Sequence, residues 1–498
     1  MSDGALTPGT ECWRIERATR AGIIIDAEDY FRLVRAAMLT AEHRIMLIGW
    51  EFDPRIDLGH SDDAPDAPRR LGEFMLWLVD RKPGLQVKIL RWDPGLLKPV
   101  SRFLGWPMLI RWFMHRQITF RFDARHPFGG SHHQKIVVID DCLAFAGGID
   151  ITAGRWDTRA HRDDQPGRRH PSGRPYQPWH DATSILEGPA AHALGDLARE
   201  RWQVSGGGTL PVVTPRSDAW PPGYAAQFRD ISVAVSRTIP EMPGQPAVHE
   251  IEALYLALIK RARRLVYAES QYFASRRIAE AIAARLAEDD PPEFVLVNPL
   301  TAEGWLEPIA MDSARARLFE ALRRGDPRQR LRIYHPYTAG GEPIYVHAKI
   351  LIVDDKVMRI GSSNMNNRSM RLDTECDVTI DCQFDGNADL SDDIVALRNT
   401  LIAEHLGVEP AVVAARIEAD GSMIAAIEAL RTAGRSLRPY EIPNLSDVEA
   451  WLADNEALDP DGPSEMFEGL NKRGLFRNSR LRGLLSRRSK PGKTVARA

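Results

Sequence analysis

The sequence has few cysteines, no long hydrophobic run and almost no net charge. Cys12, Cys142, Cys376 and Cys382 are its only cysteines; they show no metal-ligand spacing and are too few for a disulfide scaffold. No apolar run reaches the about eighteen residues of a membrane span, and residues 1–20 contain no signal-peptide core. We therefore expect a cytoplasmic or peripheral membrane protein, with signal-independent secretion still open. A net charge of −3 argues against a protein that coats nucleic acid.

One chemical pattern occurs twice in the chain. It consists of a histidine, any residue, a lysine, four residues and an aspartate, at His133, Lys135 and Asp140 and again at His347, Lys349 and Asp354. Each copy is followed at the same distance by a pair of small residues, Gly147-Gly148 and Gly361-Ser362. Two copies of one set indicate a single site that needs two histidines and two lysines around one substrate.

Helical and strand patterns also repeat. Residues 26–43 and 251–263 have the spacing of amphipathic helices, and short apolar strands follow at 45–48 and 265–268. Further strands are predicted at 87–90, 118–122, 294–297 and 331–334, and the apolar spacers of both motifs suit buried strands. We predict an α/β fold of two halves, each a mixed β-sheet flanked by helices. The halves are related by a pseudo-two-fold axis, with the active site at their interface.

Glycines and prolines after residue 204 place the predicted boundary between the halves, giving 20–208 and 209–410. Residues 411–498 are predicted to be a helical, charged tail that is partly disordered, with an acidic block from Asp447 to Glu468 and a basic block from Lys472 to Arg497. Residues 155–179 are expected to form a long loop. Residues 97–116 mix aromatic and basic residues, which fits either a membrane-interface segment or a helix packed on the core.

The residue types of the motif point to phosphodiester chemistry. Two lysines attract phosphate oxygens and stabilise the charge of a five-coordinate transition state. Of the two histidines, one attacks phosphorus and the other protonates the leaving oxygen. The lysines supply the positive charge, so we expect neither a metal nor a cofactor. Asp140 and Asp354 lie at the far end of a strand from the lysines, where bonding to backbone amides is expected.

The flanking residues resemble the phospholipase D superfamily. Residues 147–151, 154–158 and 179–181 (GGIDI, GRWDT and WHD) resemble the first catalytic half of phosphatidylcholine-hydrolysing members, and residues 269–273 and 361–370 (ESQYF and GSSNMNNRSM) the second half. The resemblance covers about residues 20–408. We find no resemblance to the phox and pleckstrin domains of many eukaryotic members, so the chain resembles a compact catalytic core of bacterial form. It implies a phosphohistidine intermediate, with His133 the nucleophile by analogy, although the sequence does not order the two histidines.

The resemblance also implies roles for further residues. In the family a carboxylate downstream of each motif orients that motif's histidine, and Asp181 and Glu375 match these positions. Asn364 matches a residue that binds phosphate, and we group Gly148 and Ser362 with it as candidate substrate-binding residues. In the first half Asp150 stands where Asn364 stands in the second, which departs from the pattern.

The expected function is that of a monomeric phospholipase D. It would act on a glycerophospholipid at a membrane surface, hydrolyse phosphatidylcholine to phosphatidic acid and transfer the phosphatidyl group to alcohols. A cardiolipin synthase-like phosphatidyltransferase is the main alternative; its usual N-terminal hydrophobic segments are missing here. A superfamily nuclease and a non-catalytic binding module are disfavoured, the first by the acidic balance and the second by the complete set of histidines, lysines and carboxylates. We expect no nucleic-acid partner.

Overall fold

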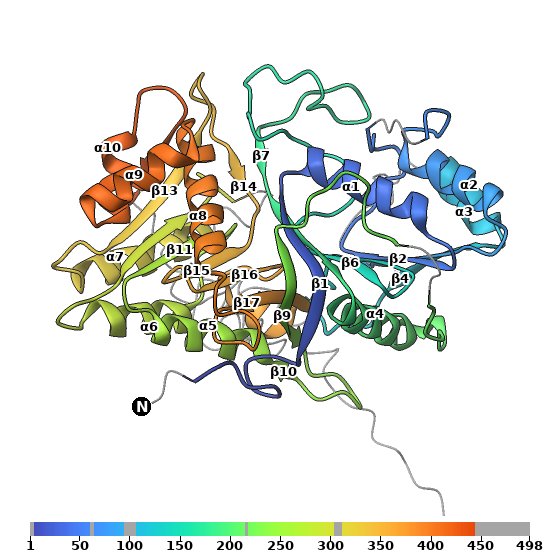
Figure 1. Ribbon diagram of the computed structural model, residues 1–498, viewed down its shortest axis with the longest axis horizontal. Coiled ribbons are helices and arrows are strands. Elements are labelled where there is room, and N and C mark those ends of the chain that lie inside the picture. The colour runs from blue at the N-terminus through green and yellow to red at the C-terminus, as the bar shows by residue number, and fades with distance from the viewer. Residues whose placement is uncertain (1–3, 60–63, 94–105, 215–217, 303–310, 444–498) are drawn as a thin grey trace, which may run out of the picture.

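The computed structural model describes the chain except residues 1–3, 60–63, 94–105, 215–217, 303–310 and 444–498 (Figure 1). The acidic and basic blocks predicted near the C-terminus therefore lie outside the described residues, as does the first part of the aromatic segment at 97–116. Among the helices that are described, none has both the length and the apolar character needed to cross a bilayer.

Strands and helices follow the same order in both halves. The first half comprises β1 (Arg14–Ile25), α1 (Ala27–Thr40), β2 (Arg44–Gly49), α2 (Leu71–Arg81), β3 (Gln86–Trp92), α3 (Trp106–Met114), β4 (Ile118–Asp123), β5 (Ile136–Ile139), β6 (Leu143–Gly147), β7 (Trp179–His180), β8 (Ala182–Glu187) and α4 (Pro189–Trp202).

The second half comprises β9 (Phe228–Ile239), β10 (Val248–His249), α5 (Glu250–Arg261), β11 (Leu265–Glu269), α6 (Arg276–Leu286), β12 (Glu293–Val297), α7 (Ser313–Arg324), β13 (Leu331–Tyr337), β14 (Tyr345–Val346), β15 (Ile350–Val353), β16 (Val357–Gly361), β17 (Glu375–Asp381), α8 (Ser391–Leu406), α9 (Pro410–Asp420), α10 (Met423–Leu430) and β18 (Ser436–Pro439).

The α/β class is confirmed, but the two predicted sheets are joined into one. The strand order is β18-β13-β12-β11-β15-β16-β17-β9-β1-β8-β6-β5-β2-β3-β4, with β10 pairing on β9, in a sheet of 16 strands. The long strands β1 and β9 pair antiparallel at its centre, from Arg14 opposite Val235 to Ala21 opposite Phe228 (Figure 1). Each half thus covers the edge strand of the other, which removes two exposed sheet edges.

Hydrophobic packing follows the same division. One core cluster joins α4 and α8 to strands of both halves, with Leu194, Trp202 and Leu401 among its buried members. A second cluster packs α1, α2 and α3 on the first half, and a third packs α5, α6 and α7 on the second. The central cluster therefore binds the two halves together.

Most of the predicted helices and strands are present, and the predicted loop at 155–179 is irregular up to residue 178, after which β7 begins at Trp179. The sequence analysis missed β1 and β9. In β1, arginines and Glu16 interrupt the apolar pattern, and burial becomes continuous only from Ala21 onward. Residues 410–443 contain α9, α10 and β18, and β18 extends the sheet by pairing with β13. The domain boundaries stay a prediction.

Candidate active site

The two motif histidines lie where short, fully buried strands begin. His133 precedes β5 and His347 precedes β15, and every residue of both strands is buried. The His133 amide donates to the Thr374 carbonyl at 3.0 Å, and the His347 amide donates to the His180 carbonyl at 2.7 Å. Each histidine backbone is therefore fixed to a segment that belongs to the other half.

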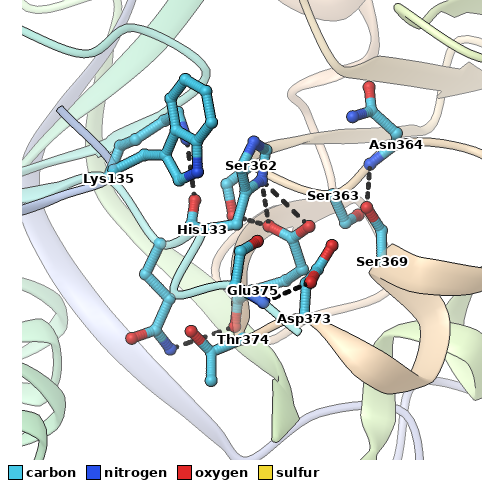
Figure 2. Close-up of polar contacts among 12 residues, drawn as sticks. His133, Lys135, Ser362, Ser363, Asn364, Ser369, Asp373, Thr374 and Glu375 are labelled. Carbon is cyan, nitrogen blue, oxygen red and sulfur yellow. Dashed lines mark hydrogen bonds and ion pairs between the residues drawn. The ribbon is translucent and has the colours of Figure 1, made fainter. Parts of the chain in front are cut away.

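The histidines and their orienting carboxylates are exchanged between the halves. His133 Nδ1 lies 3.1 and 3.0 Å from the two carboxylate oxygens of Glu375 (Figure 2). His347 Nδ1 lies 2.6 Å from Asp181 Oδ2. We had expected each histidine to be oriented by the carboxylate downstream of its own motif, and this expectation was wrong.

The exchange has a cause in strand pairing. β14, which leads into the second motif, pairs in parallel with β7, so that Val346 lies opposite His180. In the matching place of the other motif, His132 forms a parallel bridge with Thr374. In all four segments the site residue directly follows the paired residue. The pairing therefore places Asp181 next to His347 and Glu375 next to His133.

The small residues after each motif support these carboxylates in different ways. The Ser362 hydroxyl donates to Glu375 Oε2 at 2.5 Å, and Ser362 is fully buried. Gly148, at the matching position, has no such group; a Cβ atom there would lie 2.1 Å from Asp181 Oδ1. Both residues thus contact an orienting carboxylate, and their proposed contact with substrate stays a prediction.

The two lysines have different neighbours. Lys135 Nζ lies 3.3 Å from Asp150 Oδ2. Lys349 Nζ instead lies 3.4 Å from the amide oxygen of Gln271, which also accepts from Asn364 Nδ2 at 3.4 Å. Asp150 and Asn364 therefore sit close to the lysine of their own half, one charged and one neutral. Phosphate binding by Asn364 stays a prediction.

Burial and the lysines together keep the two imidazoles neutral. Burial, Lys135 and Lys349 lower the pKa of His133 well below its usual value. Burial, Lys349, Arg155 and Lys135 do the same for the pKa of His347. The lysine of each motif acts on the histidine of the other, so the two motifs form one electrostatic unit.

Burial makes the orienting carboxylates more basic, and the lysines oppose this shift. Burial raises the pKa of Glu375 to about 8 and that of Asp181 to about 6. Burial also lowers the pKa of Lys349 to about 7. With Nδ1 of each imidazole held by a carboxylate, Nε2 is the nitrogen left for a substrate.

The motif aspartates lie at the opposite ends of β5 and β15 from the histidines. Asp140 accepts the amides of Glu42, His43 and Arg44, and Asp354 accepts those of residues 263, 264 and 265. Each therefore ties the end of its strand to the start of the neighbouring strand, β2 or β11. Their contacts are those of structural residues and do not reach the histidines.

Aromatic side chains that sequence reasoning did not assign surround the histidines. The Trp179 ring stacks on Tyr345 with centroids 4.5 Å apart and lies 5.3 Å from His347. Arg155 places its guanidinium 4.1 Å above the Trp179 ring. Trp50 meets His133 edge-on at 6.4 Å. Trp179 lies two residues before Asp181, a predicted site residue. This closeness in the sequence could have indicated that Trp179 is part of the site.

Neighbouring polar groups outside the pairs are also fixed. His132 is fully buried, with Nδ1 2.7 Å from the Thr374 hydroxyl, and burial lowers its pKa to about 3. It is therefore a neutral structural residue. Within the part of the chain that the structure describes, the groups of side chains with metal-ligand spacing do not include His133 or His347.

The chain is similar to proteins of one known family. A family model described as Phospholipase D matches residues 116–279 and 325–452. Phospholipase D alpha 4 of Arabidopsis thaliana is 24% identical over 493 residues, which covers 77% of this chain and 64% of that protein. Phospholipase D alpha 1 of the same plant is 27% identical over 470 residues, which covers 67% of this chain and 58% of that protein. The chain thus spans roughly three-fifths of these relatives' length.

A solved structure shares the fold. The crystal structure of phosphatidylserine synthase from Haemophilus influenzae Rd KW20 aligns with a TM-score of 0.52 at 14% identity, over 78% of this chain and 88% of that one. This likeness concerns the arrangement of strands and helices.

Proposed function

The chain belongs to the phospholipase D family, and on that premise we propose that it hydrolyses a glycerophospholipid, phosphatidylcholine above all, to phosphatidic acid and the free head-group alcohol. The observation that carries this proposal is the pair of exchanged histidine–carboxylate contacts, His133 with Glu375 and His347 with Asp181. Two oriented imidazoles beside two lysines, one neutral to attack and one that takes up and gives a proton, are what a two-step displacement at phosphorus requires.

In the first step, His133 Nε2 attacks phosphorus. A nitrogen–phosphorus bond forms and the bond to the head-group oxygen breaks, with its electron pair staying on that oxygen. His347 donates the proton that this oxygen takes up. The negative charge of the bound phosphate offsets the lysine charges that lower the pKa of His347 in the free protein, so substrate binding favours its protonated form.

In the second step, His347 accepts a proton from water, and the water oxygen attacks phosphorus. The nitrogen–phosphorus bond breaks, its electrons return to His133, and phosphatidic acid leaves. An alcohol can replace water in this step, which yields a phosphatidyl-alcohol instead. Transfer to a lipid alcohol, as in a cardiolipin synthase, is thus the alternative outcome of the same chemistry.

Access to lipid requires contact with a bilayer surface, and α3 offers an apolar face for it. Trp112 and Leu109 pack into the core, whereas Ile110, Phe113 and Met114 are 50%, 51% and 80% exposed. One face of the helix packs on the core, as one of the two expectations for this segment had it, and the membrane-interface expectation stays a prediction. We assign the exposed face to peripheral membrane contact.

One assay tests the proposed function. The protein is incubated with phosphatidylcholine vesicles and a short primary alcohol, and lipid products are separated. We expect phosphatidic acid and the phosphatidyl-alcohol from wild type, and neither product from His133→Ala or His347→Ala. His43→Ala, which removes a histidine outside the site, is the matched control and keeps activity.

The ratio of products separates the alternatives. Product formed only when a lipid alcohol is supplied identifies a phosphatidyltransferase. Release of nucleotides from DNA with no lipid product contradicts the proposal. Trapping of radiolabelled phosphoenzyme in His347→Ala but not in His133→Ala supports the assigned order of the histidines.

A further inference from the structure

A second group of histidines and carboxylates lies between the two halves and takes no part in the proposed chemistry. Its members are Asp26 after β1, His161 in the long loop, His180 in β7 and Glu404 in α8. All four are buried, with exposures of 1%, 1%, 0% and 7%. Three come from the first half and one from the second, so the group bridges the interface.

The four side chains point their ligand atoms at one another. His161 Nε2 lies 3.3 Å from Asp26 Oδ2 and 3.1 Å from Glu404 Oε1. His180 Nδ1 lies 3.1 Å from the same Glu404 oxygen and 3.1 Å from Asp26 Oδ1. In a tetrahedral site with bonds of about 2.0–2.1 Å, ligand atoms are about 3.3 Å apart. These four separations, which involve both oxygens of Asp26, are close to that edge length, and the four residues each offer a ligand atom within 4.8 Å of the others.

Asp26 Oδ2 and His180 Nδ1 are buried and lie 3.1–3.3 Å from neighbouring ligand atoms, but neither makes a hydrogen bond of good geometry. Both point into the space shared by the four side chains. A buried polar atom without a partner is costly and calls for a missing ligand. Asp26 and His161 also adopt positive φ values of 64° and 41°, which residues other than glycine rarely do.

The outer nitrogens of both histidines are held by further carboxylates. His161 Nδ1 lies 3.1 Å from Asp157 Oδ2, and His180 Nε2 lies 2.8 Å from Glu269 Oε2. A histidine that binds a metal through one nitrogen usually donates the other N–H to a carboxylate, which fixes its tautomer. Both histidines therefore have the second partner that a metal-bound imidazole needs.

The charges around the group are compatible with a bound cation. The group and its outer partners contain four carboxylates: Asp26, Asp157, Glu269 and Glu404. Arg168 bonds Asp157 and Arg159 bonds Glu404, which neutralises two of them. Arg435 offsets part of the charge on Asp26 and Glu404, and His405 contacts Glu269. The negative charge that remains is balanced either by protons on the imidazoles or by one divalent ion.

We propose that Asp26, His161, His180 and Glu404 bind one divalent transition-metal ion, with zinc as the best match. Two nitrogen and two oxygen ligands in a closed, buried tetrahedron fit a structural zinc site. This proposal departs from our sequence-based expectation of no metal, and it leaves the chemistry of the two motifs unchanged.

The ion would support the catalytic pair at a distance. The Asp181 amide donates to Asp26 Oδ1 at 3.1 Å, and the Asp26 amide donates to the Asp181 carbonyl at 2.8 Å. His180, the adjacent residue, would itself bind the ion. The metal would therefore fix the backbone that presents Asp181 to His347, and would tie α8 to the first half.

The test uses the full chain and zinc alone. Protein stripped by a chelator is dialysed against Zn²⁺, and bound metal is measured by mass spectrometry. We expect one ion per wild-type chain, and loss of that ion in His161→Gln and Asp26→Asn. Asp157→Asn, which changes only the outer partner, should weaken binding by about 10- to 100-fold in competition with a chromophoric chelator.

A spectroscopic measurement covers ligand variants that fold poorly. Co²⁺ added to stripped wild type should give the intense visible absorption of tetrahedral coordination. His335→Gln, which alters a buried histidine bonded to the Asn298 carbonyl, is the matched control and should keep both ion and spectrum. Folded wild type that binds no stoichiometric ion, or stoichiometric binding retained in both ligand variants, overturns the proposal. In the first case protons balance the charge.

Discussion

Replacing Gly148 by alanine should disable one histidine pair without touching either histidine. The added Cβ would lie 2.1 Å from Asp181 Oδ1 and 3.1 Å from its Cγ. Non-bonded carbon and oxygen atoms stay about 3.3 Å apart, so the carboxylate must move by about 1 Å. Asp181 cannot move easily, because its other oxygen is 2.6 Å from His347 Nδ1 and its Oδ1 accepts the Ala182 amide at 2.8 Å.

A displacement of this size breaks the contact that orients His347. A misplacement of about 1 Å in a catalytic group costs about 10²-fold in rate, which is about 2.7 kcal/mol of transition-state stabilisation. We expect Gly148→Ala to lower kcat for vesicle hydrolysis by this factor, with a smaller change in KM. The assay measures phosphatidic acid release at saturating lipid, and circular dichroism confirms the folded fraction.

Two variants serve as controls for Gly148→Ala. Ser362 already has a Cβ atom at the position that matches Gly148, so Ser362→Ala removes only the hydroxyl that donates to Glu375. This loss costs about 1 kcal/mol, or about fivefold in rate. Gly84→Ala adds a methyl group where no atom lies within 4 Å and should behave as wild type. A folded Gly148→Ala protein with wild-type kcat would refute the reasoning.

Three further predictions follow from the same structure. Glu375→Gln should slow phosphoenzyme formation by about 10²- to 10⁴-fold, because His133 loses its proton acceptor; normal burst amplitude and rate in rapid quench would contradict this. Asp140→Ala should lower the free energy of unfolding by about 2–4 kcal/mol through three lost amide bonds, while kcat per folded molecule changes little; urea titration and activity check both. Burial and Arg315 lower the pKa of His335 to about 3. In the unfolded chain His335 has a pKa of about 6.5, so it becomes protonated below that pH, whereas in the folded chain it stays neutral. The free energy of unfolding therefore decreases as the pH falls. At pH 5 this loss is about 2 kcal/mol, and His335→Gln should remove it; equal pH dependence of urea unfolding in both proteins would exclude it.

Local pattern was enough to predict the motif strands and the repeat. The spacers of both motifs are apolar and β-branched, and they form the buried strands β5 and β15. The structural role of Asp140 and Asp354 followed from their distance along the strand. These features depend on residues that are close in the sequence, so the periodicity of apolar residues is enough to predict them.

Contacts between the two halves could not be predicted from local sequence patterns. His133 and Glu375 are 242 residues apart, and His347 and Asp181 are 166 apart. The bridge of His132 to Thr374 and the pairing of β7 with β14 decide which carboxylate meets which histidine. The family resemblance pointed to Asp181 and Glu375, which do contact the motif histidines, but it assigned each to the wrong histidine. The four side chains of the proposed metal site come from four separate segments, and no spacing rule links them.

The exchange of carboxylates makes each half, taken alone, an incomplete unit. A separated half would hold an imidazole without its acceptor and a carboxylate without its donor, as in an enzyme whose active sites are shared across a dimer. Covalent linkage keeps the two halves at a high effective concentration whatever the dilution. Linkage also allows the two histidine–carboxylate pairs to diverge, because a substitution near one carboxylate changes only the pair to which that carboxylate belongs. Gly148 and Ser362, which differ at matched positions, are an instance of that freedom.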